Sequence, residues 1–192
     1  MDAKQRLADE EKTPHPNALS GVTTGGDQTA YIALGSNLGD RAANITAAVN
    51  ALRNTPHVKV IRESTLLENP AIGGSGDSPP FLNAMSEVHT TLPPINLLHR
   101  LLEIEKELGR VRRAKWEPRI IDLDLILYGD QIIQTAELIV PHPLMHQRRF
   151  VLQPLAQLCP DLIHPIQKLS IADLLERMSP APIDVRNMSR QT

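Results

Sequence analysis

Several features that would point to a particular class of protein are scarce or missing in this sequence. Its 192 residues contain one cysteine, Cys159, so no disulfide can form within the chain. The apolar residues around Cys159 are typical of a buried thiol rather than a nucleophile. No apolar run is long enough to span a membrane, and the first residues lack the hydrophobic region of a secretion signal. We therefore expect a cytoplasmic protein that does not bind membranes.

Apolar periodicity is also missing from residues 1–29, which are polar, and we interpret them as a flexible extension. The chain as a whole is 41% hydrophobic, which is enough for a single core in a domain of this size. We expect one folded domain at 30–180 and a short tail at 181–192.

Within the domain, alternating and helical apolar patterns predict a regular order of elements. The expected elements are a strand at 30–37, a helix at 39–54, strands at 57–68 and 81–92 around a Pro/Gly-rich loop at 69–80, a helix at 93–109 and a strand at 119–129. This order is typical of an α+β fold with a ferredoxin-like, split βαβ sheet. We expect a hairpin and loop at 129–143 and a final helix around 170–178 as C-terminal additions to the same sheet.

Two carboxylates interrupt the apolar strand at 119–129. Side chains alternate along a strand, so Asp122 and Asp124 would share one face with Ile126. The opposite face is predicted to hold three leucines, Leu123, Leu125 and Leu127. Like charges about 7 Å apart, the spacing set by the rise per residue, repel unless a cation lies between them or one takes up a proton. Two interpretations stay open: an exposed edge strand with two solvated acids, or a divalent-metal site.

A dense group of cations precedes the aspartates. It consists of Arg110, Arg112, Arg113, Lys115 and Arg119. Guanidinium groups bind phosphate through paired hydrogen bonds, and two acids holding Mg²⁺ beside them would complete a site for phosphoryl transfer. From the residues alone, the alternative is a solvated loop whose charges neutralise one another.

Aromatic residues are few, and their positions argue against nucleic-acid binding. A sheet that binds RNA carries exposed aromatics along adjacent central strands, and no such arrangement is evident here. A net charge of -2 adds no general attraction to a polyanion. Three aromatics instead flank polar motifs, where they could enclose one planar heterocycle: Phe81, Trp116 and Phe150. For each of these aromatic residues considered alone, packing into the core is the more common outcome.

Together these motifs resemble the 6-hydroxymethyl-7,8-dihydropterin pyrophosphokinase family of the folate pathway. The resemblance runs from about Tyr31 to Pro165 and includes YIALGSNLGDR, NPAIG, FLNA, LGRVRRAKWEPRIIDLDLILYG and VPHPLMHQRRFVLQPL in the family's order. It implies a ferredoxin-like fold and transfer of pyrophosphate from ATP to the pterin hydroxymethyl group, with AMP released and Mg²⁺ as cofactor. This chain departs from the family at Glu117, which adds negative charge near the phosphates.

The resemblance also implies roles for individual residues. Asp122 and Asp124 resemble the ligands of two Mg²⁺ ions that bridge the triphosphate, and Arg110 and Arg119 resemble the arginines that support transfer. The positions similar to the family's contacts with ATP are Glu105, Arg112, Arg113, Lys115, Trp116, His142 and Arg148.

On the pterin side, Phe81 and Phe150 resemble the pair that stacks on the ring, and Asn83 resembles the amide that binds its edge. A flat neutral ring with donors and acceptors along one edge suits two aromatics and an amide. Further contacts are implied for the backbone of three loop residues, Asn69, Pro70 and Ile72.

Two other functions remain open from the residues themselves. A non-catalytic module that binds RNA or protein gains nothing from paired acids beside its basic loop, so the aspartates argue against it. A Mg²⁺-dependent kinase that transfers only the γ-phosphoryl group is excluded by the resemblance alone. We expect a monomeric, monofunctional enzyme whose partners are ATP and the dihydropterin.

Overall fold

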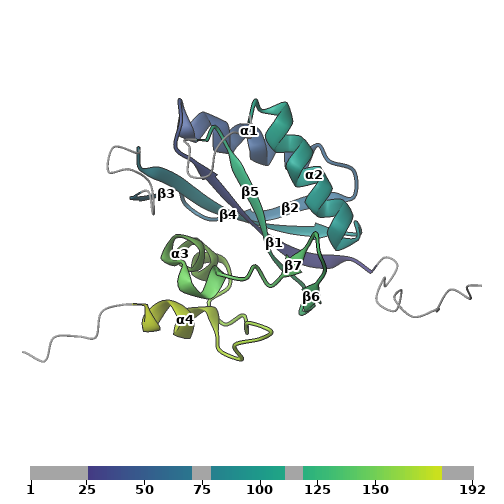
Figure 1. Cartoon of the computed structure of the whole chain (residues 1–192), viewed down its shortest axis with the longest axis vertical. Helices are drawn as coiled ribbons and strands as arrows, with labels where there is room; N and C mark the ends of the chain where they lie inside the picture. The colour runs from purple at the N-terminus through teal and green to yellow at the C-terminus, as the bar shows by residue number, and fades with distance from the viewer. Residues whose placement is uncertain (1–25, 71–78, 111–118, 179–192) are drawn as a thin grey trace, which may run out of the picture.

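The computed structural model describes residues 26–70, 79–110 and 119–178, which form a five-stranded sheet with helices on both faces and a separate two-stranded sheet (Figure 1). In chain order the elements are β1 (Gln28–Ser36), α1 (Arg41–Arg53), β2 (Val58–Glu63), β3 (Leu67–Asn69), β4 (Phe81–Thr90), α2 (Pro94–Glu107), β5 (Asp122–Tyr128), β6 (Ile133–Gln134), β7 (Ile139–Val140), a 3₁₀ helix (Met145–Gln147), α3 (Arg149–Leu158) and α4 (Ile171–Arg177).

The main sheet has the order β2-β4-β1-β5, and every pairing in it is antiparallel. This is the predicted split βαβ arrangement, in which β4 lies between the two strands that α1 connects. Helices α1 and α2 cover one face and α3 covers the other, with α4 packed against α3 (Figure 1). The predicted C-terminal hairpin is present as β6 and β7.

The expected strand at 57–68 is wrong as a single element, because it forms two strands, β2 and β3, that both pair with β4. Between them, the backbone N–H of Thr65 donates to Oε1 of Gln157 on α3, at 2.9 Å. A side chain far away in sequence thus takes the hydrogen bond that a continuous strand would use. The start of β1 also differs, since it begins at Gln28 rather than near Ala30.

Local sequence explains how the helices are placed. The carboxylate of Asp40 accepts a hydrogen bond from the N–H of Ala43 at 3.0 Å and starts α1. Helix α2 begins at a proline and presents the predicted apolar stripe to the sheet, with Leu97, Leu101 and Ile104 fully buried. No helix among the described residues is long and apolar enough to cross a membrane.

The side chains of β5 do not alternate as predicted along its whole length. A bulge leaves Ile126 without a partner on β1. Before it, Leu123 and Leu125 lie in the core beneath α1 and α2, as expected. After it, Leu127 joins the core on the α3 face and Tyr128 joins the core beneath α1 and α2. Grouping Leu127 with the two earlier leucines was wrong, because an extra residue in one strand reverses its alternation.

A polar cluster lies between the sheet and α3. Glu87 of β4 is buried and forms an ion pair with Arg62 of β2. Tyr31 of β1 forms a hydrogen bond with Cys159, which follows α3. Burial raises the pKa of the Cys159 thiol to about 11, although the hydrogen bond with Tyr31 opposes this. The prediction that Cys159 is an unreactive thiol agrees with this raised pKa.

We expect the Cys159 thiol of the folded protein to react slowly with an aromatic disulfide reagent at neutral pH. A pKa two units above that of a free thiol leaves about a hundredfold less thiolate, and only the thiolate attacks. The measurement compares labelling rates in the native protein and in denaturant. Equal rates in the two states would contradict the burial of this thiol.

Candidate active site

One edge of the sheet collects polar side chains from three adjacent strands. In the ladder register, Gly35 of β1 lies between Asn83 of β4 and Asp122 of β5. Asp122 and Asp124 lie on the face opposite Leu123, which is the face that α3 covers. A Cβ atom at Gly35 would lie 3.3 Å from Oδ1 of Asn83, so the missing side chain leaves space beside this amide.

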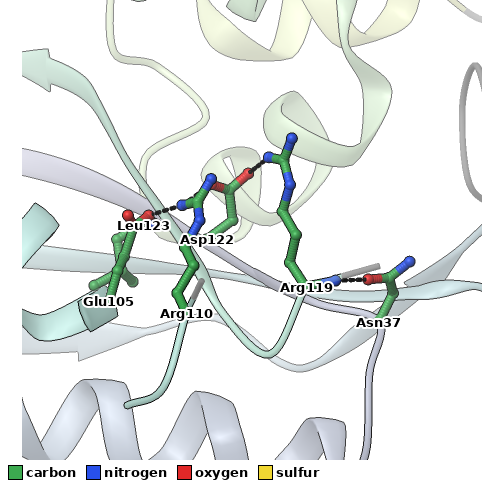
Figure 2. Close-up of polar contacts among 6 residues, drawn as sticks. All are labelled: Asn37, Glu105, Arg110, Arg119, Asp122 and Leu123. Carbon is green, nitrogen blue, oxygen red and sulfur yellow. Dashed lines mark hydrogen bonds and ion pairs between the residues drawn. The ribbon is translucent and has the colours of Figure 1, made fainter. Parts of the chain in front are cut away.

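Asp122 binds two arginines at once (Figure 2). Its Oδ1 accepts a hydrogen bond from Arg110, and its Oδ2 accepts one from Nη1 of Arg119 at 2.9 Å. The two arginines come from different segments, one after α2 and one just before β5. The predicted residues Arg110, Arg119 and Asp122 therefore form a single ion-pair network.

Glu105 of α2 lies beneath this network and is 2% exposed. Its Oε1 accepts a hydrogen bond from the N–H of Leu123 at 2.7 Å and forms an ion pair with Arg110 (Figure 2). Gly109, with φ of 90°, ends α2 in a left-handed turn, and this turn brings Arg110 back against Glu105. Burial raises the pKa of Glu105 to about 7, opposed by the hydrogen bond from Leu123 and by Arg110.

Asp124 is half-buried, and among the described residues it takes part in no hydrogen bond or ion pair. Burial and the neighbouring charge of Asp122 raise its pKa to about 6, against the opposing effect of Arg148. β5 is an edge strand of the main sheet, as the interpretation of two solvated acids on an exposed edge strand expected, but neither aspartate is fully exposed. One carboxylate is neutralised by arginines, and the other is held close to it without a counterion of its own.

The two carboxylates fit Mg²⁺. No group of three or more His, Cys, Asp or Glu side chains in the described part of the chain could hold a metal ion on its own. Mg²⁺ is, however, commonly bound by one or two carboxylates together with substrate phosphates and water. Each oxygen of Asp122 keeps a free lone pair beside its arginine, and Asp124 has both oxygens available among the described residues.

Residues from the C-terminal segment complete the α3 side of the site. His142 follows β7, and its N–H donates to the carbonyl oxygen of Ile126 at 2.9 Å, which holds it against β5. Burial, followed by the charge of Arg148, lowers the pKa of His142, which favours the neutral form of its ring. Arg148 caps α3, and its Cζ lies 5.7 Å from the ring centre of Phe150.

Asn83 has the surroundings of a ligand-binding amide. It is 6% exposed, and its Nδ2 is buried with no hydrogen-bond partner among the described residues. A buried donor without a partner destabilises a fold, so this amide calls for an explanation, and its place beside Gly35 at the end of the ladder is compatible with a bound molecule. Phe81 starts the same strand, and its ring would lie 3.6 Å from a Cβ atom at Gly35, so the predicted aromatic and amide lie together.

Comparisons with known proteins agree with this geometry. The family model described as 7,8-dihydro-6-hydroxymethylpterin-pyrophosphokinase matches residues 31–160. The 2-amino-4-hydroxy-6-hydroxymethyldihydropteridine pyrophosphokinase of Bacillus subtilis is 46% identical over 130 residues, which are 68% of this chain and 77% of that protein. The chain belongs to the 7,8-dihydro-6-hydroxymethylpterin-pyrophosphokinase family.

Other matches include a protein of similar length and two longer proteins. The enzyme of Pseudomonas aeruginosa with the same name as the B. subtilis protein is 43% identical over 70% of this chain and 83% of its own length. Folic acid synthesis protein fol1 of Pneumocystis carinii is 43% identical over 152 residues, but the chain spans only 20% of it. The structure of Plasmodium falciparum HPPK-DHPS with pteroate has a TM-score of 0.63 over 80% of this chain and 44% of its own, and its 14% identity supports the fold alone.

Of the residues predicted for the loop after β3 and the basic segment before β5, the structure describes only some. Asn69 ends β3 opposite Phe81, with its Nδ2 donating to the carbonyl oxygen of Leu67 at 3.4 Å, and Pro70 follows it at the surface. Five of the predicted residues lie outside the described part of the chain: Ile72, Arg112, Arg113, Lys115 and Trp116.

Gly35 and Asn37 are not among the residues predicted for the site from the sequence, although both lie within the quoted motif YIALGSNLGDR. Gly35 lies between Asn83 and Asp122, and Asn37 contacts Arg119. The available signal was a Gly-Ser-Asn sequence directly after a buried strand, where turn residues are common. Such residues are normally assigned to a turn, and only the register of the sheet reveals their neighbours.

We expect opposite effects on stability when the two aspartates are replaced by asparagine in metal-free buffer. The folded-state pKa of Asp124, about 6, lies above its usual 3.8, so its ionised form destabilises the fold at pH values above 6, and this effect disappears below 3.8. Asp124→Asn should therefore raise Tm by a few degrees, about 2–4 °C per kcal/mol, at neutral pH. Asp122→Asn should lower Tm, because Arg110 and Arg119 lose their shared partner.

Thermal unfolding followed by circular dichroism, in the presence of a chelator, measures both variants across this pH range. A decrease in Tm for both variants would show that Asp124 has a stabilising partner in the folded protein.

Proposed function

We propose that this chain transfers the pyrophosphoryl group of ATP to the hydroxymethyl group of 6-hydroxymethyl-7,8-dihydropterin, forming the pterin diphosphate and AMP for folate biosynthesis. Family membership supports this activity. The observation that supports this activity at the level of residues is the register of the sheet, in which Asn83, Gly35 and Asp122 lie opposite one another on three adjacent strands. At one end of this row the amide of Asn83 has no partner among the described residues, and at the other the carboxylate of Asp122 is paired with two arginines. The reaction needs a group that binds the heterocycle and a charged centre that binds the phosphates, and the two ends of this row would provide them.

On the phosphate side, the arginines are held by acids but keep donors to spare. A guanidinium has five N–H donors, and Arg119 uses one of them on Asp122 among the described contacts. The remaining donors of Arg110 and Arg119 would bind phosphate oxygens and stabilise the charge that develops during transfer. Mg²⁺ held by Asp122 and Asp124, in the form of two ions, would neutralise charge on the triphosphate and orient it.

ATP would also be contacted by residues around this centre. His142 in its favoured neutral form can donate or accept a hydrogen bond, while Arg148 adds positive charge near Asp124. Glu105 is too deeply buried to present its carboxylate to solvent, and we infer that it acts on the nucleotide site through Arg110. The basic residues of the loop before Arg119 would add further phosphate contacts: Arg112, Arg113 and Lys115, with Trp116 beside them.

On the pterin side, the ring would lie over the bare position at Gly35, with its edge bonded to Asn83. Phe81 and Phe150 would stack on its two faces, and the backbone of the loop that begins at Asn69 and Pro70, and includes Ile72, would contact its edge. The hydroxyl oxygen of the pterin would then form a bond to the β-phosphorus as the bond from that phosphorus to the AMP oxygen breaks, and the hydroxyl proton would pass to solvent. No protein nucleophile is required, in agreement with the high pKa of Cys159.

The competing functions fit the described structure less well. An RNA-binding sheet needs exposed aromatics on an open face. Here both faces of the sheet are covered by helices, and Tyr31 and Tyr128 are 7% and 3% exposed. A kinase that transfers only the γ-phosphoryl group uses similar charges, so the identity of the nucleotide product distinguishes it. Monomeric state and cytoplasmic location stay predictions.

We expect equal amounts of AMP and pterin diphosphate when the protein is incubated with ATP, Mg²⁺ and the dihydropterin. Asp122→Asn and Asp124→Asn should each reduce turnover by several orders of magnitude, because metal stabilisation of the transition state contributes several kcal/mol at roughly tenfold per 1.4 kcal/mol. Asp130→Asn, which changes an exposed acid just after β5, should leave turnover unchanged. Chromatographic separation of the nucleotides gives both results. ADP as the product would indicate γ-phosphoryl transfer.

Asn83→Ala should weaken binding of the dihydropterin, measured by calorimetry with a non-hydrolysable ATP analogue, by about five- to thirtyfold. This is the effect of losing one or two hydrogen bonds of about 1 kcal/mol each. Affinity for the analogue itself should not change. Ser86→Ala is a matched control, because Ser86 is also a buried polar residue of β4 without a partner among the described residues, but its side chain lies on the opposite face. Equal pterin affinity in the two variants would place the ring elsewhere.

A further inference from the structure

Asn37 is a buried polar residue with no role in the site so far. It follows β1 in the turn that leads to α1 and is 3% exposed. A buried amide must find partners for both its donor and its acceptor. Its neighbour in the same turn region, the half-buried Asn44 of α1, donates from Nδ2 to Oγ of Ser36 and to the carbonyl oxygen of Leu38, both within eight positions of it in sequence. Asn37 bonds to residues far away in sequence.

The backbone of Arg119 is held by Asn37 at both of its polar groups. The N–H of Arg119 donates to Oδ1 of Asn37 at 2.7 Å (Figure 2), and the N–H of Asn37 donates to the carbonyl oxygen of Arg119 at 3.1 Å. Arg119 lies outside β5, which begins at Asp122, so the sheet ladder does not fix its position. Asn37 provides the hydrogen bonds that a strand partner would otherwise provide.

The side chain of Arg119 binds Asp122, because Nη1 of its guanidinium donates a hydrogen bond to Oδ2 of Asp122 at 2.9 Å. Asn37, Arg119 and Asp122 therefore form a continuous series of contacts from the end of β1 to the start of β5 (Figure 2). On its other side, Nδ2 of Asn37 donates to the carbonyl oxygen of Pro79 at 3.4 Å, two residues before the strand that carries Phe81 and Asn83. One amide thus contacts the chain on the phosphate side and on the pterin side.

We infer that Asn37 is a positioning residue for the transfer reaction, which sets the place of the Arg119 guanidinium relative to Asp122. This rests on the proposed function. Asn37 does not touch the reacting atoms itself and acts through Arg119. Positioning matters because a displacement of about 1 Å in a group that stabilises a transition state can cost about a hundredfold in rate.

The first test compares three variants of the full chain in the AMP-release assay. Asn37→Ala should lower kcat by about ten- to a hundredfold, with the KM for ATP changed by less than about threefold, since the other phosphate contacts remain. Asn37→Asp keeps the acceptor for the Arg119 N–H and should restore most of the lost kcat. Asn44→Ala removes a comparable amide from the same turn region without touching Arg119, and kcat should not change. Equal kcat losses in Asn37→Ala and Asn44→Ala would overturn the inference.

A double-mutant cycle with Arg119→Ala shows whether the effect passes through Arg119. If it does, adding Asn37→Ala to Arg119→Ala should cost less than about twofold in kcat, because residues that act as a unit are strongly non-additive. Loss of the same factor in both backgrounds would show that Asn37 acts on something else.

Hydrogen exchange at the Arg119 amide tests the contact without any activity measurement. Exchange should accelerate in Asn37→Ala and stay slow in Asn37→Asp and Asn44→Ala. If the wild-type protein released no AMP, the proposed function would fail while this exchange result still stood. If the wild type were active and Asn37→Ala equally active, the positioning role alone would be wrong.

Discussion

The carboxylate of Asp122 holds together two segments of the chain whose arginines would otherwise repel one another. Arg110 follows the end of α2, Arg119 precedes β5, and Asp122 starts β5. Two guanidinium groups this close to each other are stable only with an anion between them, and Asp122 presents one oxygen to each. The buried carboxyl group of Glu105 contacts Arg110 from the other side. Under the proposed function, the remaining donors of the two arginines would be available to an incoming phosphate.

Much of the fold could be predicted from the sequence, because it depends on regular patterns. The buried stripe of α2 and the order of strands follow from apolar periodicity, and the structure has both. The bulge at Ile126 and the break between β2 and β3 could not be predicted. Each depends on a distant partner, since the break is stabilised by Gln157 and the bulge by the register against β1. Periodicity carries no information about such partners.

The site itself shows the same division. Asp122, Asp124 and Arg119 could be predicted because charges that interrupt an apolar strand are conspicuous. Asn37 could not, since an asparagine after a strand is typical of a turn, and its contact with Arg119 crosses 82 positions of sequence. Stability alone would favour neither the lone carboxylate of Asp124 nor the unpartnered amide of Asn83. Sequences depart from the most stable arrangement most often at functional sites, which is compatible with the proposed role of both groups.

The row formed by Asn83, Gly35 and Asp122 has a consequence for the size of the molecule that fits between its ends. Neighbouring strands are about 4.8 Å apart, so residues that lie opposite one another across three strands are separated by about 10 Å at their ends. This distance is fixed by main-chain hydrogen bonds and not by the length of any side chain. A substitution can change which ring or which charged group is bound, but it cannot bring the two ends closer. Under the proposed function, the backbone of the sheet would thus set how far apart the heterocycle and the phosphates lie, and a different spacing would require another register of β1 against its neighbours.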